Sequence, residues 1–142
     1  GKVIQVGNTV TVFNLPSITD SANNDVAGPG TGPNNTSRIG LMYEFLMTAS
    51  LTGGNTFTLN AGTAAGRATA DVFRGMAIYN NTATDPGAVT AFTAGGTDTL
   101  TLTATTKGGL EGAQIQCRSV DGLLWQVSAQ LIGNGAFANP WS

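Results

Sequence analysis

Alternation of apolar and polar residues dominates this chain and predicts a protein built from β-strands. Four segments alternate most clearly, residues 55–60, 98–104, 113–118 and 123–131. One side of each carries Phe, Leu, Ile, Val, Trp, Cys or Ala, and the other carries mainly Thr, Gln or Ser. A two-residue repeat rich in β-branched and aromatic side chains is the pattern of a strand with one buried face. These segments therefore predict sheets that each bury one side in a core.

Weaker strand patterns occur in the rest of the chain. They are residues 3–13, interrupted at Gly7 and Asn8, residues 38–48, residues 72–79 and a short segment near 88–92. Residues 72–79 are apolar on both sides except at Arg74, which predicts a strand covered on both faces or one that faces a subunit contact. Residues 63–73 suit a short helical turn as well as a loop. We therefore predict an all-β fold, a single-domain antiparallel β-sandwich or barrel-like structure over residues 1–142, with about eight or nine strands and extended N- and C-terminal arms.

The loop that follows residues 113–118 predicts a β-hairpin and its register. A two-residue Asp-Gly loop would place Ile115 and Cys117 on the same face as Gln126, because a slip of one residue moves every side chain to the opposite face. A three-residue loop instead pairs Ser119 with Leu123 and Cys117 with Trp125, so that the apolar faces agree. We therefore expect the three-residue loop.

Thr52, Gly53 and Gly54 predict a second hairpin by the same reasoning. It would pair residues 39–51 with residues 55–61 and give a continuous apolar face.

Two segments lack a strand pattern. Residues 14–37 form a long polar loop that holds three of the five prolines, and such loops are usually functional or mobile. Residues 133–142 form a Gly-rich C-terminal arm that carries Phe137, Pro140 and Trp141. For Trp141 three outcomes stay open: anchoring in a pocket of a neighbouring subunit, docking on its own domain, or disorder.

The chain is poor in charge, which narrows the classes of partner. Only 10% of residues are charged and the net charge is −2, against about 25% in typical domains. Six cations spread along the chain form no basic patch, so we expect no nucleic-acid partner. No run approaches the roughly 20 apolar residues of a membrane span, so we expect no membrane partner. A neutral polar surface can pack against protein without removing water from ions, although a secreted β-protein would also fit.

The chain contains no histidine, which removes the commonest general base and metal ligand. No spacing typical of a zinc site occurs. Cys117 is the single cysteine, lies on an apolar face, and is expected to be a buried structural thiol. We therefore expect neither catalysis, nor a metal, nor another cofactor.

Carboxylates offer the remaining routes to chemistry. Asp20 and Asp25 miss the spacing of a calcium loop. Asp98 and Glu111 flank a predicted hairpin and could pair as the acids of a glycoside hydrolase.

Glu44 lies mid-strand among apolar residues. A buried carboxylate needs a partner, and Arg38 and Arg74 are the candidates for a structural ion pair.

Residues 97–133 carry a resemblance to a known class of proteins. The segments are TDTLTL at 97–102, GAQIQCRSVDG at 112–122 and LWQV at 124–127. They resemble capsid decoration (cement) proteins of tailed bacteriophages and related head or tail fibre modules. The resemblance implies a homotrimer on the capsid surface of a virion, assembled in the host cytoplasm, which bridges neighbouring major capsid proteins without catalysis.

Three hypotheses follow from the sequence. The first is a decoration protein whose contacts with the major capsid protein include Phe137, Pro140, Trp141, Pro29 and Pro33. The second is a receptor- or glycan-binding module of a fibre or adhesin, which predicts an exposed aromatic platform. The third is a small hydrolase that uses Asp98 and Glu111.

Overall fold

The structure, a computed structural model, describes residues 1–16, 18, 40–62, 71–82, 89–120 and 124–142. In that part of the chain it contains nine strands and no helix. The strands are β1 (Lys2–Val6), β2 (Thr11–Asn14), β3 (Met42–Met47), β4 (Thr56–Asn60), β5 (Val72–Asn81), β6 (Val89–Thr97), β7 (Thr99–Thr103), β8 (Gln114–Ser119) and β9 (Leu124–Gly133). The all-β prediction is confirmed.

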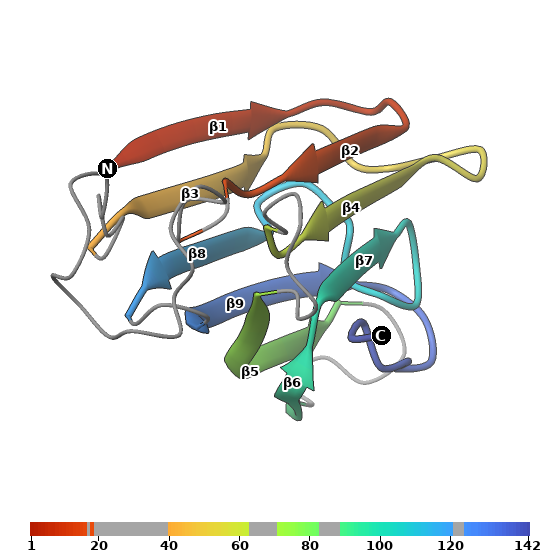
Figure 1. Cartoon of the computed structure of the whole chain (residues 1–142). Coiled ribbons are helices and arrows are strands. Elements are labelled where there is room, and N and C mark those ends of the chain that lie inside the picture. The colour runs from red at the N-terminus through yellow and green to blue at the C-terminus, as the bar shows by residue number, and fades with distance from the viewer. Residues whose placement is uncertain (17, 19–39, 63–70, 83–88, 121–123) are drawn as a thin grey trace, which may run out of the picture.

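The strands form two sheets that share one core. The larger sheet has the order β1-β3-β8-β9-β5-β6 and the smaller has the order β2-β4-β7. Figure 1 shows the smaller sheet lying over one face of the larger one. The alternating residues point as the sequence predicts, with Phe57, Leu59, Leu100 and Leu102 of the smaller sheet fully buried. Across the core they meet the inner face of the larger sheet, which includes Trp125.

Both sheets are mixed, which corrects the prediction of an antiparallel fold. β1 pairs with β3, β2 with β4 and β5 with β9 in parallel, while the remaining pairs are antiparallel. The chain crosses from the larger sheet to the smaller one between β1 and β2, and again between β3 and β4. The second crossing lies beside the first and runs in the same direction (Figure 1), so its strands pair in parallel with those of the first.

The predicted hairpin between residues 39–51 and 55–61 is wrong, because β3 and β4 belong to different sheets. Their apolar residues meet across the core instead, with the Phe45 and Phe57 ring centroids 5.5 Å apart. Asn8 holds the two crossing loops together, since its Nδ2 donates to Thr52 Oγ1 at 2.6 Å and its Oδ1 accepts from Asn55 Nδ2 at 3.0 Å.

The β8–β9 hairpin has the predicted faces but a different register. Cys117 lies opposite Val127 and Ser119 opposite Trp125, a shift of two residues from the predicted pairs. A shift of two preserves which face each side chain occupies, so the apolar pattern does not distinguish the two registers. Small Ser119 leaves room beside the large Trp125 side chain, which is fully buried.

The terminal segments are part of the sandwich, which corrects the expectation of extended arms. Residues 1–14 supply the edge strands β1 and β2 of the two sheets. At the other end, the Thr101 amide donates to the Pro140 carbonyl and the Thr99 amide to the Ser142 carbonyl. The last residues therefore lie along the free edge of β7.

Several sequence predictions fall outside the described residues. They concern most of the polar loop 14–37, which includes Asp20, Asp25, Pro29 and Pro33, and also Arg38. They further concern most of residues 63–73, which were expected to form a short helical turn or a loop. No helix in the described residues is long and apolar enough to span a membrane.

Candidate functional site

Trp141, expected on a partner surface, is buried by its own domain. Only 6% of its surface is exposed. Its ring packs on Phe73, with centroids 5.9 Å apart, and its Nε1 donates to the Phe92 carbonyl at 3.3 Å. Its backbone bridges to Leu100 of β7. Of the three outcomes left open by the sequence, the structure shows docking on the same domain.

The other predicted contact residues of the tail are also packed against the sandwich. Phe137 is half-buried and meets Tyr79 edge-on, with ring centroids 4.3 Å apart. Pro140 is buried. In this arrangement the tail closes the core, so contact surfaces must be sought elsewhere on the described residues.

The outer face of the larger sheet is a broad surface that spans six strands of the described part of the chain. All five glutamines of the sequence lie on it, Gln5, Gln114, Gln116, Gln126 and Gln130. We call this surface the glutamine face. The sequence pattern placed Gln114, Gln116, Gln126 and Gln130 on solvent-facing sides of separate strands and made no prediction for Gln5. Only the strand order brings all five together.

Apolar and charged side chains complete the glutamine face. One row across the strands runs from Val3 through Glu44, Gln116 and Ser128 to Met76, and Val3 and Met76 are both exposed. The neighbouring row includes Met42, Arg118, Gln126 and Arg74. The face thus mixes amides and methionines with few charges.

Glu44 on this face is half-buried and does not make the predicted ion pair with Arg74. Its Oε1 accepts a hydrogen bond from Gln114 Nε2. Strands β8 and β9 lie between β3 and β5, so the strands that carry Glu44 and Arg74 are about 14 Å apart at the usual strand spacing. Within the described ranges, the partner of the Glu44 carboxylate is thus an amide of the adjacent strand.

Asp98 and Glu111 are not brought together. Asp98 precedes β7 at the end of the smaller sheet that holds Asn60. Glu111 lies beyond the other end, where its amide donates to Ser50 Oγ at 3.0 Å. Because β7 has five residues between these ends, the acids are separated by more than about 13 Å. The paired-acid hypothesis therefore has no geometric basis.

Asp71 is a buried acid that sequence reasoning missed. It is fully buried, and its Oδ2 accepts a hydrogen bond from the Ile18 amide at 2.9 Å. It ties residue 18 to the start of β5, which is a structural role. Among the described residues no group of three potential metal-ligating side chains occurs.

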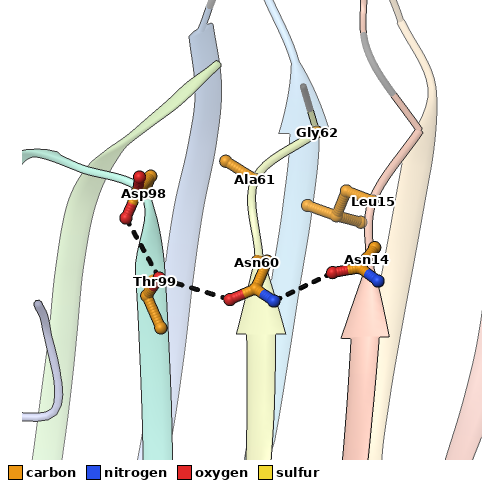
Figure 2. Close-up of a pocket in the computed structure, with 7 residues that line it drawn as sticks. All are labelled: Asn14, Leu15, Asn60, Ala61, Gly62, Asp98 and Thr99. Atoms are coloured by element: carbon orange, nitrogen blue, oxygen red, sulfur yellow. Dashed lines mark hydrogen bonds between the residues drawn. The ribbon is translucent and has the colours of Figure 1, made fainter. Parts of the chain in front are cut away.

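A polar pocket opens at one end of the smaller sheet. It has a volume of about 440 Å³ and is lined by Asn14, Leu15, Asn60, Ala61, Gly62, Asp98 and Thr99. The strand register places Asn14, Asn60 and Thr99 directly beside one another on adjacent strands. Figure 2 shows their side chains in one row, with Asp98 at the β7 end.

Hydrogen bonds connect the row from end to end (Figure 2). Asn60 Nδ2 donates to Asn14 Oδ1 at 2.8 Å. The Thr99 hydroxyl lies 3.2 Å from Asn60 Oδ1 and 3.0 Å from Asp98 Oδ1. A hydroxyl carries one hydrogen, so Thr99 serves one of these two acceptors at a time. Backbone hydrogen bonds from Leu15 to Asn60 and from Ala61 to Asp98 hold the strand ends in place.

Cys117 is a core thiol, as the sequence predicts. Its side chain is buried, and burial raises the pKa of the thiol from an ordinary value of 9.0 to about 12. At neutral pH it carries no thiolate to act as a nucleophile.

The pKa of Cys117 predicts an alkaline loss of stability. The folded state keeps the thiol proton at pH values where the unfolded chain has released it. The stability that depends on the protonated thiol is therefore complete below about pH 9 and is lost towards pH 12. At about pH 10.5 the loss should reach about 2 kcal/mol of unfolding free energy. Urea unfolding at about pH 8 and about pH 10.5 measures it.

Cys117→Ala is the control for this measurement. Burial also raises the pKa of Tyr79, so the variant should keep part of the pH dependence but lose the share due to the thiol. Equal pH dependence in the two proteins would contradict the assignment to Cys117.

Comparison with models of known protein families, with curated proteins and with solved structures finds no match to this chain. The resemblance of residues 97–133 to phage decoration proteins therefore stays a prediction.

Proposed function

We propose that this chain is a virion structural protein that decorates and stabilises a phage capsid by bridging neighbouring major capsid proteins. The observation that carries the proposal is the glutamine face. It is broad, exposed and made of amide and apolar side chains, with Glu44, Arg74 and Arg118 as its charges. Such a face can be buried against a protein with little cost from removing water around ions.

The size of the face supports action in several copies. Six strands about 4.8 Å apart, with about six residues each at 3.3 Å, cover roughly 500 Å². A standard protein interface buries about 800 Å² per partner. Because accessible surface exceeds flat area, one glutamine face amounts to about one standard contact. A homotrimer on a repeating lattice would make several such contacts at once, which strengthens binding overall.

A second surface supports the homotrimer. β1 and β2 are edge strands of the two sheets, and Val10 (66%) and Val12 (59%) are exposed in the connection between them and on β2. Residues 1–14 contain no proline and Lys2 as their single charge. An edge with exposed β-branched residues and a single charged side chain is suited to pairing with another chain. We assign this edge to contacts between copies.

Binding to shells tests the proposal. The full chain is incubated with expanded and unexpanded shells of the particle that carries it, and co-sedimentation is measured. We expect binding to expanded shells. Gln116→Glu combined with Ser128→Glu should weaken binding at least tenfold, because it buries two further negative charges beside Glu44.

Thr105→Glu is the matched control, since it adds a charge at an exposed position outside the glutamine face. It should bind like the unmodified chain. Sedimentation of the free protein should give a trimer mass. Failure to bind either shell, or full binding by the Gln116 and Ser128 variant, would contradict the proposal.

The alternative function is a glycan-binding module, which predicts an exposed aromatic platform. The six Phe, two Tyr and two Trp side chains all belong to described residues, and each is buried or half-buried. None of them stands out from the surface as the open aromatic platform that this alternative predicts. The polar pocket of the smaller sheet is the remaining feature suited to a saccharide.

A further inference from the structure

We propose that the pocket lined by Asn14, Asn60, Asp98 and Thr99 binds a neutral saccharide through hydrogen bonds to its hydroxyl groups. The inference rests on the smaller sheet and is independent of the proposed capsid role. The row of side chains leaves part of its hydrogen-bonding capacity unused.

The Asp98 end of the row has more acceptors than donors. Thr99 donates its one hydrogen either to Asp98 Oδ1 or to Asn60 Oδ1, so one of these oxygens is always available. In the described part of the chain, Asp98 Oδ2 accepts no hydrogen bond. A ligand that meets this end must therefore donate, as a hydroxyl group does.

The Asn14 end of the row supplies donors. Its Oδ1 accepts from Asn60, which turns the two Nδ2 hydrogens of Asn14 towards other partners. Asn14 is exposed, so these donors are accessible. Donors at one end and an anionic acceptor at the other match a ligand whose neighbouring groups both donate and accept, which describes the hydroxyls of a sugar.

The geometry of the row suits a small saccharide. Asn14 and Thr99 lie two strand spacings apart, about 10 Å. The pocket volume of about 440 Å³ falls within the 300–1,000 Å³ typical of ligand sites. Backbone pairing holds the row in place before any ligand arrives, which lowers the entropic cost of binding.

A divalent cation fits the pocket less well. Asp98 is the one carboxylate in its lining, whereas protein calcium sites gather several carboxylate and carbonyl oxygens. The pocket also lies on the smaller sheet, away from the glutamine face of the larger one (Figure 1). A saccharide could therefore bind while the glutamine face is engaged.

Titration of the ¹⁵N-labelled full chain tests the inference. The probes are glucose, galactose, mannose and N-acetylglucosamine, with disaccharides of each. At least one should produce saturable shifts at the amides of Leu15, Asn60 and Thr99. Asp98→Asn keeps the side-chain volume but removes the charge, so it should weaken binding at least tenfold.

Gln126→Ala, on the glutamine face, is the matched control and should bind as the unmodified chain does. Thermal unfolding of Asp98→Asn verifies that it folds. Dissociation constants weaker than about 10 mM for every probe, or saturable shifts with calcium chloride and none with saccharides, would overturn the inference. So would unchanged binding by folded Asp98→Asn. Failure of the shell-binding experiment would leave the saccharide inference standing, because that experiment probes the larger sheet.

Discussion

Gly133→Ala is expected to destabilise the protein by about 3 kcal/mol or more, at the upper end of the cost of overpacking. Gly133 ends β9, opposite Asn81. A Cβ there would overlap the Tyr79 hydroxyl and lie 2.6 Å from the Thr105 carbonyl oxygen. Tyr79 would have to move, and its hydrogen bond to Thr105 and its contact with Phe137 would be lost.

Urea unfolding followed by tryptophan fluorescence measures the effect. Gly135→Ala is the control in the same segment, because its Cβ would meet nothing closer than 3.4 Å and should change stability little. Adding Tyr79→Phe to Gly133→Ala removes the overlapping hydroxyl and should recover part of the loss. Equal effects of the two glycine substitutions would contradict the packing argument.

Trp141→Ala is expected to cost about 3 kcal/mol in the isolated chain, since truncation of a buried Trp usually costs 3–5 kcal/mol. The side chain packs on Phe73 and donates to the Phe92 carbonyl, so its loss opens a cavity between the tail and β5. Thermal unfolding should show a midpoint lower by roughly 10 °C.

Val89→Ala provides the comparison, because Val89 is exposed and its truncation should alter stability by less than about 0.5 kcal/mol. The same experiment separates two roles for the tail. If Trp141 instead served mainly to anchor in a neighbouring subunit, its substitution would leave the isolated chain as stable as before. That result would contradict the docked position seen in the structure.

Both substitutions concern a tail whose place the sequence left open. A Gly-rich segment that carries Phe137, Pro140 and Trp141 is compatible with an extended arm and with a docked strand. The decision depends on whether β7 has a free edge and whether Phe73 and Tyr79 offer space beside it. Those conditions arise only after distant strands have assembled.

The candidate sites, like the position of the tail, depend on how distant strands assemble. Alternation correctly predicted that Gln114, Gln116, Gln126 and Gln130 face away from the core. It did not predict that they share one face with Gln5. The pocket row could not be found at all, because Asn14, Asn60 and Thr99 are separated by about 40 residues or more in sequence. The parallel β2–β4 pairing and the β4–β7 pairing bring them together.

Alternation along the chain is enough to predict the all-β class, the positions of the clearest strands and the side of each strand that is buried. These follow from the two-residue repeat, a property of each local segment. Tertiary structure alone decided which strands pair, in which direction and register, and where the tail docks. Hydrophobic burial is non-directional, so any apolar face can cover any other, and only backbone pairing and packing in the assembled sandwich select one arrangement.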